Sequence, residues 1–434
     1  MRIGILPNLD PASGGVYQYS QTILHALNVW GKNGCEDHFV LFTNTTQIRR
    51  PTISLRPEYW EIIPLETRKL LDRMRQKVGE GPHREAWRWL RKHLEQFLSN
   101  GRPNPPVPDP EVVRKRADLR RQLLRCHVEL LMYPHPTVIA FEAGVPYVIA
   151  VHDLQHRLQP EFPEVSANGL WEYREYLFRN ACRQATVIVA DSEVGKEDVL
   201  DCYGGYGVTP DRVKVLPYLP ASYLAVDVSE AEQKMVRSLY QLPERYLFYP
   251  AQFWPHKNHA RIVQALGLLD REHHIEAPIV FCGSYSGDIR ENTYGNVVAL
   301  ASKLGIENQV KYLGYVPEEH MSALYAGAVA LVMPTFFGPT NIPVLEAWSF
   351  GCPVLTSDIR GIREQVGNAA VLADPRSVEA IAEGIYRLWT DENLRSTLAD
   401  AGRRRVSSYT ADDFCNRLIE IVEEAKGRVR CSAN

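Results

Sequence analysis

Short apolar runs recur along the chain, and between them apolar residues return every three or four positions. The runs predict strands buried on both faces of a parallel sheet, while intervening stretches such as 14–30 and 259–270 predict helices. In the first half of the chain, the predicted strands are 2–8, 38–44, 145–153 and 185–192. In the second half, they are 245–253, 277–284, 309–316, 328–334 and 353–358.

The alternation of strands and helices predicts an α/β protein with two doubly wound parallel-sheet domains. A chain of 434 residues is long for a single hydrophobic core, which favours the same division. Proline, serine and acidic residues interrupt the pattern at 216–233. We therefore expect a first domain over 1–220 and a second domain over 221–409.

Composition excludes several classes of protein. A net charge of −3 and 45% hydrophobic residues are typical of a globular protein, and exclude a disordered chain or a strongly basic nucleic-acid binder. The eight cysteines form no CxxC pair, so neither a zinc site nor a disulfide framework is predicted. The N-terminus lacks the apolar stretch of a signal peptide, and no apolar run reaches membrane-spanning length. We expect a cytoplasmic protein.

Residues 65–127 depart from this pattern, because they contain sixteen Lys and Arg against eight Asp and Glu. Within them, 83–98 place Trp and Leu on one face of a predicted helix and arginines on the other. Such a basic helix can lie on the inner face of an anionic membrane or receive an anionic acceptor. It can equally be a helical insertion that packs on the first domain with its charges in water.

The segment 333–358 raises a chemical question, because a single acid, Glu346, lies within an apolar run. The loop before it is rich in turn residues, Pro343 suits the first turn of a helix, and Gly351 suits its end. We expect Glu346 in the first turn, where free N–H groups and the helix dipole favour a ligand with negative charge and hydroxyls. The alternative is that Glu346 only complements the helix dipole.

Three further pieces follow predicted strands. Gly14 and Gly15 open a helix, and their lack of side chains lets backbone N–H groups approach a ligand. His152 ends a strand, where a histidine can be catalytic or structural. Lys257 lies near a helix start, where it can bind phosphate or be an ordinary surface lysine. His152 and His156 have no third ligand at metal-binding spacing, so no metal site is predicted.

Together these motifs resemble the retaining glycosyltransferases of family four, the glycosyl transferases group one, which have the GT-B fold. The resemblance covers nearly the whole chain outside the basic insertion. It implies two Rossmann-like domains facing a central cleft, with the donor on the second domain and a last helix, 410–434, that packs back on the first. The segments that carry it are 14–19, 151–153, 250–266, 280–284, 311–317 and 337–358.

The resemblance implies roles for individual positions. Glu346 matches the acid that binds the ribose hydroxyls of the nucleotide. Lys257 matches the lysine that holds the diphosphate, and His152 matches the histidine near the donor sugar, so these two are the expected catalytic residues. The other donor-binding positions that the resemblance implies are Gly14, Gly15, Gln252, Gly283, Tyr315, Val316, Gly338, Pro339, Thr340 and Asn341.

Two positions depart from the family pattern. The first Glu of the signature would fall at position 338, which is Gly, so Thr340 or Asn341 is expected to contact the sugar instead. The arginine that commonly accompanies the lysine would fall at position 252, which is Gln. The diphosphate charge should then rest more heavily on Lys257 and on helix dipoles.

The resemblance implies transfer of a hexose, with retention, from a nucleotide diphosphate sugar to a glycan or lipid-linked hydroxyl, as in assembly of a surface polysaccharide. A departing phosphate can take the acceptor's proton, so no protein base, metal or cofactor is expected. A double displacement would need a nucleophilic carboxylate, for which Asp153 is a poor candidate. A non-catalytic nucleotide-sugar binding protein and a nucleotide-sugar epimerase are the alternatives, while the missing GxGxxG disfavours an NAD-dependent dehydrogenase.

Overall fold

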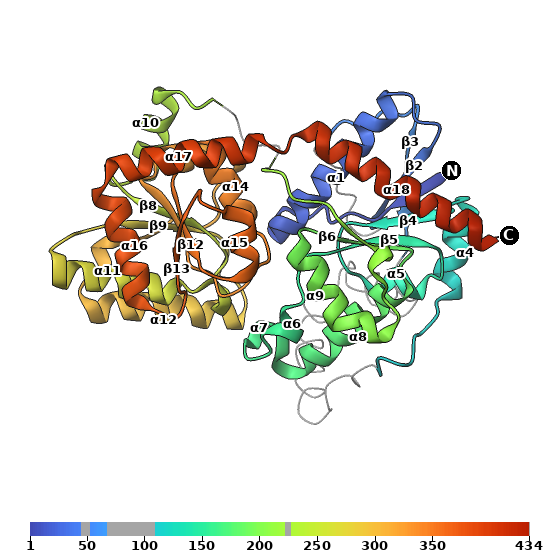
Figure 1. Ribbon diagram of the computed structural model, residues 1–434, viewed down its shortest axis with the longest axis horizontal. Coiled ribbons are helices and arrows are strands. Elements are labelled where there is room, and N and C mark those ends of the chain that lie inside the picture. The colour runs from blue at the N-terminus through green and yellow to red at the C-terminus, as the bar shows by residue number, and fades with distance from the viewer. Residues whose placement is uncertain (45–52, 67–108, 222–226, 434) are drawn as a thin grey trace, which may run out of the picture.

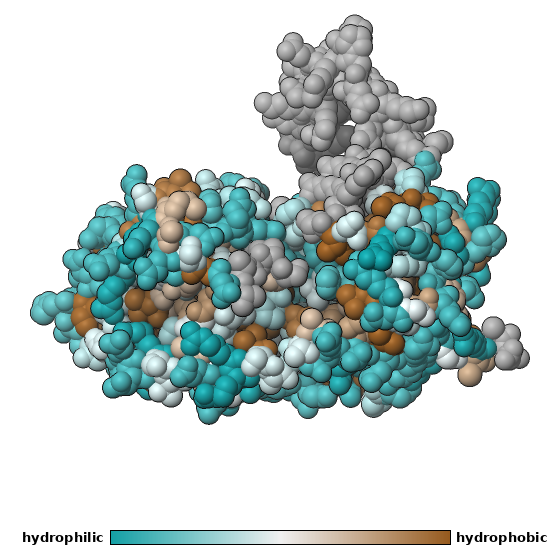
Figure 2. Space-filling view, turned by 90° about the horizontal axis from the view of Figure 1, so that it is seen from above, coloured by the Kyte–Doolittle hydropathy of each residue, from teal (hydrophilic) through white to brown (hydrophobic). Residues whose placement is uncertain are grey.

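The computed structural model describes residues 1–44, 53–66, 109–221 and 227–433, which form two α/β lobes lying side by side (Figure 1). The basic helix expected over 83–98 lies outside these residues. Hydrophilic residues predominate on the face that Figure 2 shows, with apolar residues scattered among them. Among the described helices, none combines the length and the apolar character needed to cross a membrane.

The first lobe is built on a seven-stranded parallel sheet with the order β3-β2-β1-β4-β5-β6-β7. Gly4 of β1 pairs with Val40 of β2 on one side and with Leu131 of β4 on the other. Neighbouring residues of β5 enter opposite faces, since Val148 belongs to one apolar cluster and Ile149 to the other. The strands are β1 (Arg2–Ile5), β2 (His38–Asn44), β3 (Trp60–Leu65), β4 (Leu130–Tyr133), β5 (Tyr147–Val151), β6 (Val187–Ala190) and β7 (Val213–Val215).

The second lobe is built on a six-stranded parallel sheet with the order β10-β9-β8-β11-β12-β13. Leu331 of β11 pairs with Phe248 of β8 and with Val354 of β12. One continuous apolar core surrounds this sheet and includes the fully buried Trp348. The strands are β8 (Leu247–Pro250), β9 (Ile279–Cys282), β10 (Val310–Tyr312), β11 (Ala330–Met333), β12 (Val354–Ser357) and β13 (Val371–Ala373).

Helices cover both faces of each sheet (Figure 1). Those of the first lobe are α1 (Gly15–Lys32), α4 (Ala117–Arg125), α5 (Val138–Glu142), α6 (Gln155–Leu158), α7 (Pro163–Ser166), α8 (Leu170–Gln184) and α9 (Glu193–Tyr203). Those that follow are α10 (Glu230–Leu239), α11 (His259–His273), α12 (Asp288–Leu304), α13 (Glu318–Gly327), α14 (Ile342–Ser349), α15 (Arg360–Val366), α16 (Val378–Thr390), α17 (Glu392–Ser407) and α18 (Ala411–Ala433).

The predicted fold class, two doubly wound parallel sheets, is confirmed. All nine predicted strands occur, although most are shorter than their apolar runs; the run 309–316 contains only β10. Most residues beyond the strand ends form loops instead, and Gln309 ends a 3-10 helix, Glu307–Gln309. Four strands were not predicted, namely β3, β4, β7 and β13, and among these β7 has only three residues with a lysine in the middle. So short a segment gives too few positions for periodicity to reveal it.

The last helix, α18, leaves the second lobe and lies against the sheet of the first (Figure 1). Phe414, Leu418 and Val422 enter the same apolar cluster as the β1 residues. Farther along, the Lys426 amino group lies 2.6 Å from a carboxylate oxygen of Asp37, whose other oxygen lies 2.7 Å from the N-terminal ammonium. Both side chains are less than a tenth exposed, so α18 is fixed by apolar packing and by a buried ion pair.

Replacing Lys426 by Met should reduce the free energy of unfolding by about 2 kcal/mol, because the buried Asp37 carboxylate loses one of the two cations that it contacts and keeps the N-terminal ammonium. Urea denaturation at neutral pH measures this change. Lys214→Met is the matched control, since Lys214 also pairs with α18, through Glu424, but both side chains are about a third exposed. Its cost should stay below about 1 kcal/mol, and equal costs for the two variants would contradict the role given to burial.

Candidate active site

A cavity of about 530 Å³ lies between the lobes, at the carboxyl edges of the two sheets. The strand order of each sheet reverses there, between β1 and β4 and between β8 and β11, and such points form ligand crevices in open α/β sheets. The side chain of Gln18 donates to a carboxylate oxygen of Glu318 across the lobes at 3.3 Å. The cavity walls include Pro11, Gly14, Gly15 and Gln18 of the first lobe, and Gln252, Gly283, Tyr285, Tyr315, Val316, Glu318 and Glu346 of the second.

Glu346 lines this cavity from α14, but the prediction that it lies in the first turn is wrong. The helix begins at Ile342, so Glu346 is one turn farther in, away from the free N–H groups. Its side chain is buried, and the Tyr325 hydroxyl donates to one carboxylate oxygen at 2.6 Å. Burial raises the pKa of Glu346 to about 7. The position and burial of Glu346 therefore disfavour a role as partner of the helix dipole and favour a role in binding a ligand.

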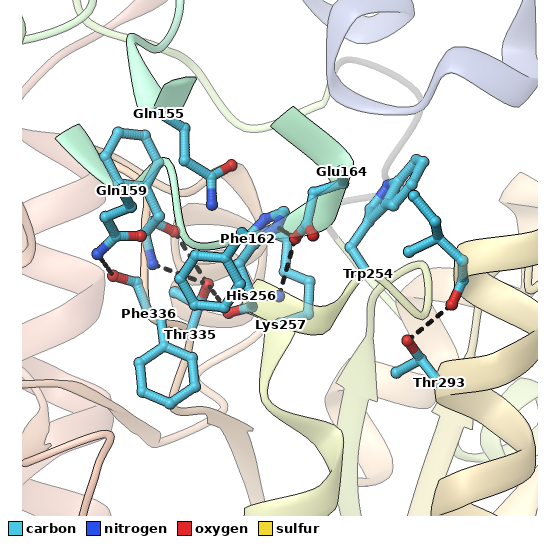
Figure 3. A network of polar contacts seen from close by, with 12 residues as sticks. Gln155, Gln159, Phe162, Glu164, Trp254, His256, Lys257, Thr293, Thr335 and Phe336 are labelled. Carbon is cyan, nitrogen blue, oxygen red and sulfur yellow. Dashed lines mark hydrogen bonds and ion pairs between the residues drawn. The ribbon is translucent and has the colours of Figure 1, made fainter. Parts of the chain in front are cut away.

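Lys257 ends a short 3-10 helix, Pro255–Lys257, that follows β8. The Tyr249 hydroxyl donates to its carbonyl oxygen at 2.9 Å and so fixes the backbone of this turn. Burial lowers the pKa of Lys257 to about 8, although the nearby carboxylates of Asp153 and Glu164 oppose that change. Lys257 does not line the cavity itself; it lies beside His256 at the boundary between the lobes (Figure 3).

His152 follows β5 and holds hydrogen bonds at both ring nitrogens. Its Nε2 lies 2.7 Å from the carbonyl oxygen of Pro134, which can only accept, so Nε2 carries a proton. The Tyr218 hydroxyl, 2.7 Å from Nδ1, can then donate to that nitrogen. Burial lowers the pKa of His152, which favours this neutral form. The residue lies outside the cavity wall, and its bonds orient it rather than leave a nitrogen for proton transfer.

The loop that contains Gly338, Pro339, Thr340 and Asn341 does not line the cavity. The Thr340 hydroxyl donates to a carboxylate oxygen of Asp191 in the first lobe. The backbone of Asn341 exchanges two hydrogen bonds with the side chain of Gln365, at 2.9 and 2.8 Å. The Thr340 contact joins the two lobes, whereas the Asn341 bonds lie within the second lobe. Contact of Thr340 or Asn341 with the sugar stays a prediction.

Gln252 lines the cavity, and its side-chain oxygen accepts two hydrogen bonds. One comes from the Trp254 indole at 3.0 Å and the other from the Arg290 guanidinium at 2.9 Å. The guanidinium also lies over the Trp254 ring, 4.6 Å from its centroid. The sequence reasoning missed Arg290, because it belongs to α12 and comes 38 positions after Gln252. A cation therefore lies behind the wall at position 252 although the residue there is neutral.

An aromatic group forms another part of the wall. Tyr285 stacks on Tyr294, with ring centroids 4.5 Å apart, and Tyr312 lies against both rings. Tyr315 is 72% exposed, whereas the next residue, Val316, is buried in the core of the second lobe. Gly283 has a φ of 128°, and a Cβ there would come within 2.6 Å of the Ala251 carbonyl oxygen, so only glycine fits. Exposed tyrosine faces suit a planar base.

Two family models match the chain, one for each lobe. The model of glycosyl transferases group 1 matches residues 231–405, and that of glycosyltransferase family 4 matches residues 78–218. The chain belongs to this family of glycosyltransferases. It is thus an enzyme of the transferase class, as the resemblance implied.

Two relatives whose activities are named agree with this family. The glycosyltransferase is 28% identical over 320 residues to the O-antigen chain mannosyltransferase B of Escherichia coli, an alignment that covers 70% of this chain and 82% of that protein. It is 27% identical over 303 residues to the D-inositol 3-phosphate glycosyltransferase of Salinispora arenicola, covering 65% of this chain and 64% of that enzyme's own length.

Solved structures agree on the fold. That of Anabaena Alr3699/HepE in complex with UDP and glucose matches with a TM-score of 0.66 and 16% identity, and the match covers 98% of this chain and 99% of that chain. WaaG, a glycosyltransferase involved in lipopolysaccharide biosynthesis, matches with a TM-score of 0.63 and 16% identity over 97% of this chain and 99% of that chain. The GT-B fold is confirmed.

Replacing Glu346 by Gln should weaken the binding of a nucleoside diphosphate by roughly 1 to 3 kcal/mol, because charge-assisted bonds to ribose hydroxyls are lost. Above about pH 7 the variant should be at least as stable as wild type, since burial already disfavours the ionised carboxylate. Calorimetric titration and melting curves measure the two effects, with Glu383→Gln on the exposed face of α16 as control. Removing the 2′- or 3′-hydroxyl of the nucleotide should cost wild type more affinity than it costs the variant. If the two proteins lose the same affinity, Glu346 does not contact the ribose.

Lys257 predicts a pH dependence of nucleotide binding. Its amino group is charged below a pKa of about 8 and loses that charge as the pH rises. Diphosphate affinity should therefore fall about tenfold between about pH 7.5 and 9, a range in which the charge of the diphosphate itself is constant. Lys257→Met should bind weakly with a flat profile. A wild-type profile that is equally flat would remove Lys257 from the phosphate site.

Proposed function

We propose that this glycosyltransferase moves a hexose, with retention of anomeric configuration, from a nucleotide diphosphate sugar to a hydroxyl of a glycan or lipid-linked acceptor. The observation that carries the proposal is the interlobe cavity, which brings Glu346, Tyr285 and Gln252 to one wall and the glycine turn of α1 to the other. A carboxylate suits the ribose hydroxyls, aromatic faces suit a planar base, and positive groups suit the phosphates. The cavity and its margin supply all three.

Charge stabilisation on the leaving group is the main chemical task. When the bond between the anomeric carbon and the phosphate oxygen breaks, its electron pair stays on the diphosphate and the sugar becomes oxocarbenium-like. Lys257 and Arg290 are the cations at the edges of this site, and neither forms an ion pair within the described residues. We assign both to the diphosphate, where fixed donors lower the barrier most.

The acceptor's proton needs no dedicated protein base in this proposal. The acceptor hydroxyl attacks the anomeric carbon on the face that the diphosphate leaves, and its proton passes to a departing phosphate oxygen. His152 then orients the sugar side of the site from its fixed, neutral position, rather than acting as a base. Asp153 is held by Arg174 at 2.5 Å, which makes it an unsuitable nucleophile for double displacement. We propose that the reaction requires neither a metal ion nor a cofactor.

Two observations support the proposed acceptor, namely the activities of similar proteins and the positive charge of residues 65–127. One relative is named as an O-antigen chain mannosyltransferase, and a structural neighbour is described as involved in lipopolysaccharide biosynthesis. Residues 65–127 carry an excess of positive charge, which suits an acceptor bearing phosphate or a contact with an anionic inner membrane face. We therefore propose a step of surface polysaccharide assembly.

The experiment that tests this function combines binding and turnover. GDP-mannose and UDP-glucose, each with its free nucleoside diphosphate, are screened by thermal shift in the presence of a chelator, since a ligand of the folded state raises its stability. The bound sugar nucleotide is then supplied with a lipid-linked saccharide, and proton NMR reads the configuration of the new bond. We expect a stabilising nucleotide and a retained configuration. Inversion would exclude the mechanism, and tight donor binding without hydrolysis or transfer would favour a non-catalytic binding protein.

A further inference from the structure

Glu164 reaches from the first lobe into the second. It belongs to α7, and one oxygen of its carboxylate accepts from the backbone N–H of His256 at 3.0 Å and lies 2.7 Å from the His256 Nδ1. Its side chain is only 5% exposed. Figure 3 shows this carboxylate directed at the turn that carries His256 and Lys257. A charged group of one lobe is therefore buried against the phosphate-side turn of the other.

The second oxygen of Glu164 is unused. Its Oε2 is buried and has no hydrogen-bond partner among the described residues. Burial by itself raises the pKa of Glu164, but the hydrogen bonds from His256 outweigh that effect and lower it, so the group is ionised at neutral pH. A buried carboxylate oxygen without a donor is unfavourable. A ligand hydroxyl that donates to it would remove this cost.

Other polar atoms around Glu164 also lack partners. The amide nitrogen of Gln155 and the amide oxygen of Gln159 are buried and unpaired in the part of the chain that the structure describes. Gln159 is fixed by its own amide nitrogen, which donates to the Phe336 carbonyl oxygen of the second lobe at 2.9 Å. Figure 3 shows Gln155 and Glu164 extending toward the turn of Lys257. Unpaired polar atoms of Gln155, Gln159 and Glu164 thus belong to one short segment of the first lobe that contacts the second lobe through Gln159 and Glu164.

The second lobe offers no carboxylate of its own at the 338–341 loop. Gly338 has a φ of 135°, and a Cβ there would lie 2.9 Å from the amide nitrogen of Asn341, so a larger residue is strained. Thr340 is already bonded to Asp191. Within the 338–341 loop no acid is available to accept from sugar hydroxyls, whereas Glu164 of the first lobe reaches the neighbouring turn of His256.

We propose that Glu164 is a specificity-determining residue whose free oxygen accepts a hydrogen bond from a hydroxyl of the donor hexose. The inference rests on the proposed function, because it needs a sugar nucleotide bound with its phosphates toward Lys257. The sugar then lies next to the turn of His256, within reach of Glu164. Recognition of the hexose requires both lobes, since the carboxylate is held in place by His256 of the opposite lobe.

Glu164→Gln tests this assignment, because glutamine keeps the shape and one oxygen acceptor. Affinities for GDP and GDP-mannose, and for UDP and UDP-glucose, are measured by calorimetry, and the ratio within each pair gives the contribution of the sugar. For the sugar nucleotide that wild type binds, we expect its affinity relative to that of the free nucleoside diphosphate to be about tenfold or more lower in the variant. A loss of this size is typical of a hydrogen bond to a charged group. The affinity for the free nucleoside diphosphate should not change. Glu161→Gln, an exposed neighbour three positions earlier, is the matched control.

Monodeoxy analogues of the bound sugar identify the hydroxyl. Wild type should lose affinity when one particular hydroxyl is removed, and Glu164→Gln should be insensitive to the same removal. If the variant weakens the nucleoside diphosphate and its sugar equally, Glu164 only latches the lobes through His256 and the inference is wrong. An unchanged ratio would also overturn it. Failure of wild type to bind any nucleoside diphosphate sugar, dTDP-sugars included, would instead refute the proposed function.

Discussion

The parallel pairing of the strands is the constraint on which the whole site depends. Because β8 pairs in parallel with both β9 and β11, the loops after all three strands emerge at the same edge of the sheet. Those loops carry Gln252, Gly283 and the segment 334–341. The first sheet has the same order around β1, so its glycine turn emerges at the corresponding edge. The cavity exists where these two edges meet, and neither sheet forms it alone.

Charge is balanced differently at this boundary than in the rest of the protein. Lys426 and Asp37 lie in contact, as do Arg174 and Asp153, so each of these partly or fully buried charges has a partner. The amino group of Lys257 has no such contact within the described chain, and burial lowers its pKa. Burial likewise raises the pKa of Glu346. Unpaired buried charge is costly, and a ligand of opposite charge or with hydroxyl donors recovers that cost as binding energy.

The contacts between the lobes place these groups relative to one another. At the start of α9, the carboxylate of Glu364 accepts from the backbone N–H groups of Glu193 and Val194, both at 3.1 Å. An anion at a helix N-terminus is favoured by the helix dipole. The helix α18 links the second lobe to the core of the first (Figure 1). A ligand in the cavity therefore meets residues of both lobes, and its affinity depends on the energy of these contacts.

The sequence by itself determined the two parallel sheets, because buried strands such as β11 and β12 are continuous apolar runs between turn residues. It also indicated Glu346, since an acid in an apolar helix is chemically unusual. Only the tertiary structure decided that Tyr325 bonds Glu346, that Arg290 bonds Gln252, and that Glu164 bonds His256, 92 positions away. Local patterns record which face of an element is buried. They do not record which distant element packs on that face, because strand order and the meeting of the two lobes set those contacts.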